Sequence, residues 1–299
     1  VYLNGKFCAD RRAHGRKTGR TEDTEMEIAV AGLGLIGGSA AKALARAGYA
    51  CDGYDLPEVV RRAVGEGVVR ARAERFEAYD VVLIALPPDA AMRLLDTGAF
   101  RQGAVVADFC GVKGALEACV CAAPRAYRYV GCHPMAGREV SGLENSLATL
   151  FDGASMIVCE NEKTDADAVR LLEKLFADMG FANMPHCSAA YHDRKIAYTS
   201  QLAHIVSNAY VKSAAADGFS GFTGGSFQDM TRIAGVDETI WSRLYMLNRA
   251  AAEEELSVLI GHLQAYLAAL REGDEAALTA LLKEGRLRKE HLDRERRIV

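Results

Sequence analysis

Residues 27–48 read EIAVAGLGLIGGSAAKALARAG, and this stretch decides the fold of the N-terminal half. A short apolar run comes first, glycines 32, 34 and 37 follow in a G-x-G-x-x-G pattern, and an alanine-rich segment ends at Gly48. The apolar run predicts a buried strand, and the alanine-rich segment predicts a helix closed by glycine. A glycine-rich turn between a strand and a helix indicates a site for phosphate groups.

A second apolar run, CDGYD, ends at Asp55, about 20 residues after the glycine turn, as in dinucleotide-binding motifs. Gly32 permits the tight turn, Gly34 lets the backbone approach a pyrophosphate, and Gly37 allows the helix to pack closely on the strand. A carboxylate at Asp55 can accept hydrogen bonds from a ribose and repels a 2′-phosphate, so NAD is favoured over NADP. We therefore expect NAD to be held by Gly32, Gly34, Leu35, Ile36, Gly37, Asp55, Leu86 and Pro87.

Strand and helix patterns alternate from Met26 to about Met184. Continuous apolar runs such as YDVVLIALP and GAVVADF are typical of strands that are buried on both faces. The run SMIVCE, a helix over 165–180 and a short strand GFANM complete this half. Because such alternation produces parallel strands with right-handed crossovers, the fold class is α/β, and residues 26–185 are expected to form a Rossmann-like, doubly wound, mostly parallel sheet.

Residues 186–299 show helical patterns only, so we expect an all-α C-terminal domain there that contributes to the substrate site and to dimerisation. A long helical stretch covers 190–215, and residues 247–270 place leucines at three- and four-residue spacing. This apolar stripe predicts a homodimer, because it exceeds what one small helical domain covers. Residues 1–25 carry arginines, glycines and little apolar periodicity, which predicts a disordered leader.

The composition of the 299-residue chain is that of an ordinary globular protein, with a net charge of −4. Basic residues are not in excess, so a nucleic-acid partner is not expected. No apolar segment approaches the ~20 residues that a membrane span needs. The eight cysteines form no C-x-x-C pair, so we expect reduced thiols and a cytoplasmic location. No set of His, Cys, Asp and Glu has metal-ligand spacing, and a metal is not expected.

Polar side chains with useful chemistry follow the ends of the later strands, where ligands of open parallel sheets bind. The segment DFCGVKG places Gly111 and Lys113 after one strand, and CHPMAGREVSG places His133 and Glu139 after the next. A histidine on a strand end beside a dinucleotide motif is a candidate general base, with a pKa expected near the usual ~6.5. We expect the substrate to be a small molecule bound at this edge.

Four ordered motifs resemble those of the prephenate and arogenate dehydrogenase family. They are HPMAG followed by E-x-S-G, D-x-x-G-V-K, the helical H-D-x(6)-S-x-L-x-H that contains His204, and G-G-x-F-x-D-x-T-R-I-A that contains Arg232. The resemblance covers about residues 26–270.

The resemblance implies NAD-dependent oxidative decarboxylation of prephenate to 4-hydroxyphenylpyruvate, a step of tyrosine biosynthesis, by a homodimer. His133 and His204 would be the catalytic residues, with His133 polarising the hydroxyl group. Arg232 suits a substrate carboxylate, since a guanidinium is always charged and binds carboxylates in a bidentate manner. Gly111, Lys113 and Glu139 would complete the substrate site. The family often has a serine where this chain has Gly111, so that hydroxyl is missing.

Three alternatives stay open from the sequence. Arogenate differs from prephenate only in carrying an amino group in place of the keto group, so an arogenate dehydrogenase fits equally well. A β-hydroxyacid dehydrogenase would need a catalytic lysine in a G-x-x-x-K-x-x-x-N helix. Four residues after Lys195, where that motif has asparagine, this chain has Thr199. A non-catalytic NAD-binding dimer is disfavoured by the presence of His133 and Arg232.

Overall fold

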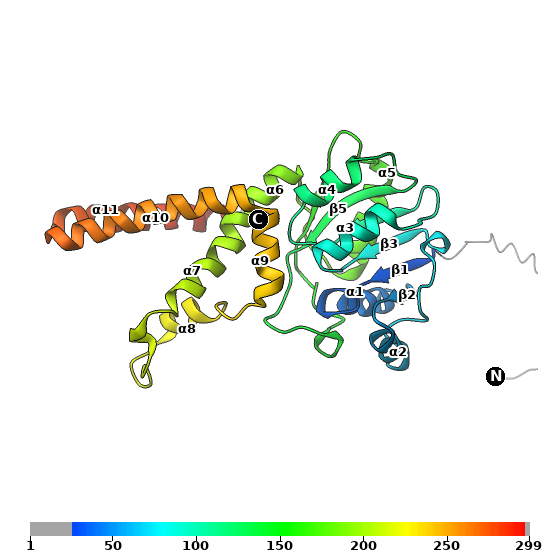
Figure 1. The fold of residues 1–299 in the computed structure, drawn as a ribbon, viewed down its shortest axis with the longest axis horizontal. Helices are drawn as coiled ribbons and strands as arrows, with labels where there is room; N and C mark the ends of the chain where they lie inside the picture. The colour runs from blue at the N-terminus through cyan, green and yellow to red at the C-terminus, as the bar shows by residue number, and fades with distance from the viewer. Residues whose placement is uncertain (1–25, 297–299) are drawn as a thin grey trace, which may run out of the picture.

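The computed structural model describes residues 26–296, which form a sheet domain followed by a helical domain with a projecting helical arm (Figure 1). The leader predicted for residues 1–25 lies outside the described residues. The sheet has seven strands in the order β2-β1-β3-β4-β5-β6-β7. The strands are β1 (Ile28–Ala31), β2 (Cys51–Tyr54), β3 (Val81–Ile84), β4 (Val105–Asp108), β5 (Arg128–Pro134), β6 (Met156–Cys159) and β7 (His186–Cys187).

The first five strands pair in parallel, β6 runs antiparallel to β5, and β7 is parallel to β6. This arrangement confirms the Rossmann-like, mostly parallel sheet expected from the alternating pattern. The carboxyl ends of β1, β3, β4 and β5 therefore meet at one edge of the sheet, where the later side chains of the site lie.

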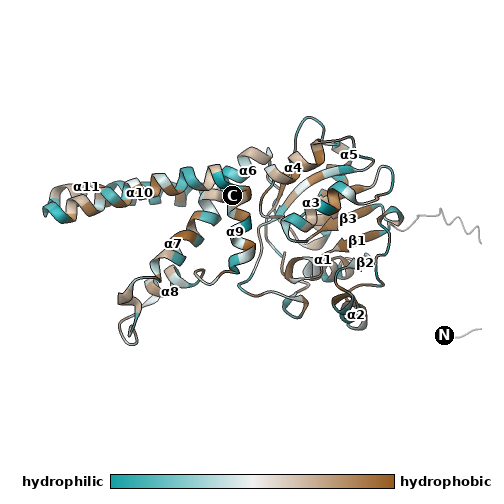
Figure 2. Cartoon of the chain, in the orientation of Figure 1, coloured by the Kyte–Doolittle hydropathy of each residue, from teal (hydrophilic) through white to brown (hydrophobic). Residues whose placement is uncertain are grey.

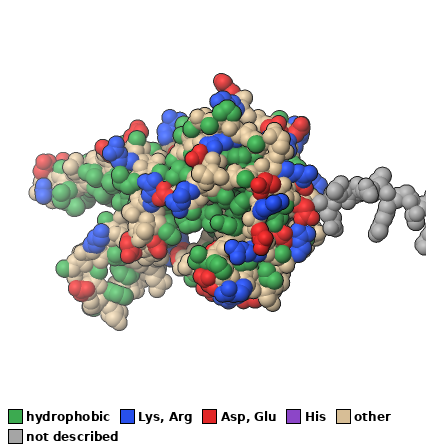
Figure 3. Space-filling view, turned by 45° about the vertical axis from the view of Figure 1, so that its right-hand side comes forward, with side chains coloured by type: hydrophobic (Ala, Val, Ile, Leu, Met, Phe, Trp, Pro, Cys, Tyr) green, Lys and Arg blue, Asp and Glu red, His purple; other side chains and the backbone are tan. Residues whose placement is uncertain are grey.

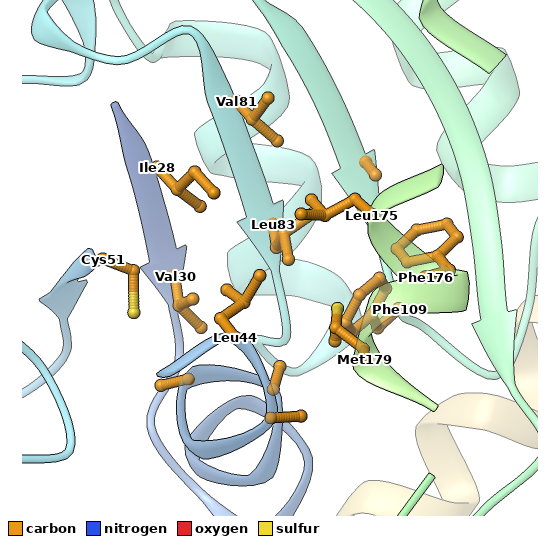
Figure 4. Packing of buried hydrophobic residues seen from close by; sticks show 14 of the residues in the cluster. Ile28, Val30, Leu44, Cys51, Val81, Leu83, Phe109, Leu175, Phe176 and Met179 are labelled. Atoms are coloured by element: carbon orange, nitrogen blue, oxygen red, sulfur yellow. The ribbon is translucent and has the colours of Figure 1, made fainter. Parts of the chain in front are cut away.

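Helices cover both faces of the sheet. The helices of this domain are α1 (Leu35–Arg46), α2 (Pro57–Gly65), α3 (Pro88–Thr97), α4 (Gly114–Cys121) and α5 (Ala166–Met179). Alternate residues of each strand point to opposite faces, so Val30 and Leu83 pack with α1, α2 and α5, whereas Ala31 and Ile84 pack with α3 and α4. Figure 4 shows the first of these layers, with Leu44 of α1 and Leu175, Phe176 and Met179 of α5 lying over the strands.

The strand predicted for GFANM is wrong in its position. In the structure, Gly180 adopts a left-handed conformation and Phe181 donates its amide to the carbonyl of Phe176, so both residues close helix α5. Asn183 makes an isolated bridge to Ser155, and the regular strand β7 begins at His186. The last strand of the sheet thus lies beyond residue 185, where the sequence placed the end of this domain.

The remaining helices form the second domain. They are α6 (Ala189–Ile196), α7 (Leu202–Tyr210), α8 (Gly225–Thr231), α9 (Glu238–Leu247), α10 (Arg249–Glu272) and α11 (Glu275–Arg296). The helical stretch predicted from residue 190 is present as α6 and α7 with a π-helical turn, Ala197–Gln201, between them. The long helices α10 and α11 pair into an arm that extends away from the sheet domain, and their brown segments in Figure 2 mark apolar residues along it.

Candidate active site

The glycine turn between β1 and α1 has the geometry of a phosphate site. Gly32 has a φ of +92°, which favours glycine, and a Cβ there would lie 2.4 Å from the carbonyl oxygen of Ala85. A Cβ on Gly37 would lie 1.7 Å from the carbonyl oxygen of Gly32. By contrast, no described atom outside the neighbouring residues lies within 4 Å of the Cβ position of Gly34. The backbone at Gly32 and Gly37 therefore packs closely against other backbone atoms of the protein, whereas Gly34 leaves space for a ligand that approaches the N-terminus of α1.

Asp55 lies beside this turn, directly after β2. Its two carboxylate oxygens accept hydrogen bonds from the amides of Leu33 and Leu56, both at 2.6 Å. These bonds fix the carboxylate next to the glycine turn while its remaining lone pairs stay free for a ribose hydroxyl. Leu86 and Pro87 follow β3 at the same edge of the sheet, and Pro87 precedes the first residue of α3. All the residues expected to hold the cofactor thus come from the carboxyl ends of three adjacent strands.

His133 lies near the end of β5, with its half-buried ring directed toward the loop after β4. A Cβ on Gly111 would lie 3.8 Å from its Nε2 atom, an ordinary contact distance. Its other ring nitrogen, Nδ1, lies 2.9 Å from Nε2 of His192. Burial, together with the nearby His192 and Lys113, holds the pKa of His133 well below its ordinary value of 6.5. The sequence-based expectation of a pKa near 6.5 is therefore corrected downward.

The structure places Lys113 away from the cavity, contrary to the expectation that it contacts substrate. Its side chain is 1% exposed, and its ammonium group forms an ion pair with Asp108 and donates to the carbonyl oxygen of Cys132 at 2.6 Å. The hydroxyl of Tyr129 donates to the other oxygen of Asp108 at 2.6 Å. With its ammonium engaged behind β5, Lys113 holds strands β4 and β5 together instead of binding a ligand.

A cavity of about 570 Å³ opens in front of His133. One wall is the loop that follows β5, and the other wall comes from the helical domain, with His204, Ile233 and Trp241 among its residues. His204 donates from Nδ1 to the carbonyl oxygen of Ile233 at 2.9 Å, and the centroid of its ring lies 3.9 Å from the ring centroid of Trp241. Burial lowers the pKa of His204, so this ring is neutral at neutral pH and offers Nε2 as an acceptor.

Arg232 follows the last residue of α8 and does not itself line this cavity. Its guanidinium forms an ion pair with Glu139, which lines the cavity, and both side chains are at least half exposed. The pair joins the loop after β5 to the helical domain. Arg138 also lines the cavity. The structure thus brings His133, His204, Arg232, Glu139 and Gly111 to one place.

His192 and Asp193 were not among the site residues predicted from the sequence. Both belong to α6, are almost fully buried, and lie directly behind His133. The signal for them was the H-D pair of the helical motif, but pattern alone did not show which strand the pair would face.

Two family models match the chain in succession. "Prephenate dehydrogenase, nucleotide-binding domain" matches residues 40–183, and "Prephenate dehydrogenase, dimerization domain" matches residues 188–284. The chain belongs to the prephenate dehydrogenase family. The junction between the two models falls where β7 ends and α6 begins, so the family's division agrees with the two parts seen in Figure 1.

Relatives of this family share about a third or less of their residues with the chain. It is 30% identical to a prephenate dehydrogenase of Bacillus subtilis, over 74% of this chain and 64% of that protein. It is 28% identical to a cyclohexadienyl dehydrogenase of Zymomonas mobilis, over 86% of this chain and 92% of that protein. Thus the chain spans less than two thirds of the Bacillus protein but nearly all of the Zymomonas protein.

Solved structures of the family superpose well on this chain. A prephenate dehydrogenase from Aquifex aeolicus, in complex with hydroxyphenyl propionate and NAD+, has a TM-score of 0.77 at 28% identity, with 89% of this chain and 98% of that chain covered.

Within residues 26–296, no helix combines the length and apolar character that crossing a membrane requires.

Proposed function

We propose that the chain is an NAD-dependent prephenate dehydrogenase, which oxidises and decarboxylates prephenate to 4-hydroxyphenylpyruvate. One observation carries the proposal: a half-buried, neutral histidine at the end of β5 faces a cavity lined by both domains, at the same edge of the sheet as a glycine turn that fits a dinucleotide. The family membership and the NAD+ complex of the Aquifex relative support it. The proposal includes a cytoplasmic location, as befits a biosynthetic enzyme.

The residues around the glycine turn fit NAD. The open side of Gly34 and the free amides at the start of α1 suit a pyrophosphate, and Asp55 suits the adenosine ribose. When bound, NAD supplies the acceptor for the hydride that leaves the substrate. The negative charge of Asp55 opposes a 2′-phosphate, which makes NADP the poorer cofactor.

The residues of this chain then hold the substrate and take up one proton. His133 accepts a hydrogen bond from the hydroxyl of the ring carbon through Nε2, and it takes that proton as the carbon is oxidised. The ring carboxylate leaves as CO2, and the electron pair of the broken bond makes the ring aromatic with a negative charge on its oxygen. The protonated His133 then returns its proton to that oxygen, which gives the phenol of the product. Arg138, which lines the cavity, and Arg232, which pairs with the cavity residue Glu139, are the cations for the substrate carboxylates, while His204 borders the same space.

The helical domain is proposed to form a homodimer. The matched family model is a dimerization domain, and the arm formed by α10 and α11 carries exposed apolar side chains. Figure 3 shows hydrophobic side chains along this arm, on the side of the molecule away from the sheet domain.

Initial rates of NADH formation test the proposal. Prephenate and arogenate are compared in parallel, each with NAD and with NADP. We expect turnover of prephenate with NAD and a lower kcat/KM with NADP. Turnover of arogenate alone would transfer the assignment to that substrate, and no turnover of either would reject the proposal.

A further inference from the structure

Three side chains form a hydrogen-bonded row behind the cavity. Nδ1 of His133 lies 2.9 Å from Nε2 of His192, and Nδ1 of His192 lies 2.7 Å from Oδ1 of Asp193. His192 is 1% exposed and Asp193 is 8% exposed, so water has little access to the row. His133 comes from β5 of the sheet domain, whereas the other two come from α6.

The carboxylate of Asp193 is held in its ionised form. Its oxygens accept hydrogen bonds from the amides of Lys113 and Gly114, both at 2.8 Å, at the start of α4. Although burial opposes the charge, these bonds and the one from His192 keep the pKa of Asp193 below its ordinary value. An ionised carboxylate can only accept hydrogen bonds, so Nδ1 of His192 must carry a proton.

That requirement passes along the row to His133. When His192 carries a single proton, that proton is on Nδ1, so its Nε2 is an acceptor and Nδ1 of His133 must donate to it. The remaining nitrogen of His133, Nε2, keeps its lone pair. This is the atom nearest to Gly111, on the cavity side of the ring.

We infer that His192 and Asp193 are positioning residues that fix the tautomer of His133, so that its Nε2 atom is the free base facing the substrate. The inference rests on the proposed function for its catalytic consequence, but the tautomer itself is a property of the protein alone. It also gives the helical domain a role in the chemistry of the sheet domain, because α6 supplies both residues.

The packing around the row depends on one glycine. A Cβ on Gly114 would lie 2.9 Å from Oδ2 of Asp193, so alanine at this position would displace the carboxylate. The other ionisable group that acts on His133 is Lys113, which is itself surrounded by Asp108, Tyr129, Cys110 and Cys132. The Cys187 thiol lies beside His192 and Asp193, and burial raises its pKa. Lys113 and Asp108 form a buried ion pair with each other. Burial raises the pKa values of the Tyr129 hydroxyl and of the Cys110 and Cys132 thiols, so these three groups stay neutral.

Nitrogen NMR of the 15N-histidine-labelled protein tests the inference directly, without substrate. At pH 8, we expect His133 to show a protonated Nδ1 and an unprotonated Nε2, with signals assigned by their loss in H133N. In H192F, which fills the same space but offers no acceptor, the proton should move largely to Nε2. In H192Q, whose side-chain oxygen can replace the ring acceptor, Nδ1 should stay protonated.

Kinetics with prephenate and NAD supply the second readout. H192F and G114A should lower kcat roughly 10- to 100-fold with KM changed less than threefold, while H192Q keeps most of kcat, since a wrong tautomer removes the base but not the binding site. I196A, a cavity-forming change on the same buried helix, controls for general loosening of α6 and should leave the tautomer unchanged.

Two results would overturn the inference. One is a wild-type His133 with its proton on Nε2, which would mean that His192 donates to it. The other is an unchanged tautomer in a folded H192F. If instead the tautomers behave as expected but neither prephenate nor arogenate is turned over, the proposed function fails while the positioning role stands.

Discussion

Gly111 leaves room for a side chain beside the base. A Cβ there would lie 3.8 Å from Nε2 of His133 and 3.9 Å from Leu244, both ordinary contacts. We expect G111S and G111A to fold normally, because no contact has to shift. The serine should raise kcat a few-fold, since its hydroxyl can accept a hydrogen bond from the protonated ring, whereas the alanine should leave kcat unchanged. A loss of activity in G111S with normal activity in G111A would show that a hydroxyl there blocks the base.

Arg232 is expected to act in substrate binding. Its guanidinium is exposed and already paired with Glu139, so a substrate carboxylate has to compete for it. For R232A we expect KM for prephenate to rise about tenfold, equivalent to about 1.4 kcal/mol, with the KM for NAD unchanged. R243A is the matched control. It removes the ion pair of Arg243 with Asp89, which is also exposed and also joins the two domains, but lies outside the cavity. An unchanged KM in R232A would remove this residue from the site.

At the scale of elements, we propose that β2 and α1 together determine the preference for NAD over NADP. Asp55 closes β2 and holds the loop before α1 through the amide of Leu33. D55N removes the charge but keeps one acceptor for that amide, so we expect a folded enzyme in which the NAD preference, measured as the ratio of kcat/KM values, narrows at least tenfold. E66Q, with the same change of charge at the end of α2, should leave the ratio unchanged. Equal use of both cofactors by the wild type would contradict the role of Asp55.

Most elements were predictable because their signals are local. The glycine turn, the apolar runs of β1, β3 and β4, and the leucine spacing of α10 each follow from a few consecutive residues. The position of β7 was not predictable, because Gly180 and Phe181 are used to close α5 before the chain can pair with β6. The position of the Lys113 side chain was also not predicted, because its partner Asp108 lies on another element, β4, and the ion pair depends on how the two elements pack.

At the scale of the whole molecule, the site could be predicted only in part. Strand ends located His133 and Gly111 at one edge, because parallel strands align their carboxyl ends. The approach of His192 from α6 depends on how the two domains pack, and no single segment records it. The pKa of His133 was misjudged in part for the same reason, since it is lowered by burial and by the nearby His192 and Lys113, and His192 comes from the second domain.

The projecting arm predicts the assembly. Val258, Ile260, Leu263, Leu267 and Leu270 of α10 are each 44–64% exposed, an unusual density of apolar surface on one helix. Light scattering at micromolar concentration should give twice the mass of the chain. The double variant L263E/L267E should give the monomer mass, whereas K163E, an exposed charge change on the loop before α5, should not. A wild-type monomer would contradict the homodimer.

The central claim is that His133 is the base of the reaction, and the pH profile of kcat tests it most directly. Only the neutral ring can accept the proton, so wild-type kcat should fall as the pH drops through the pKa of His133, which burial places below 6.5. H133N should lower kcat roughly 10²- to 10⁴-fold, with a smaller change in KM, and should lose this acidic limb. A near-normal kcat in H133N, or a loss seen only in KM, would contradict the account and make His204 the next candidate.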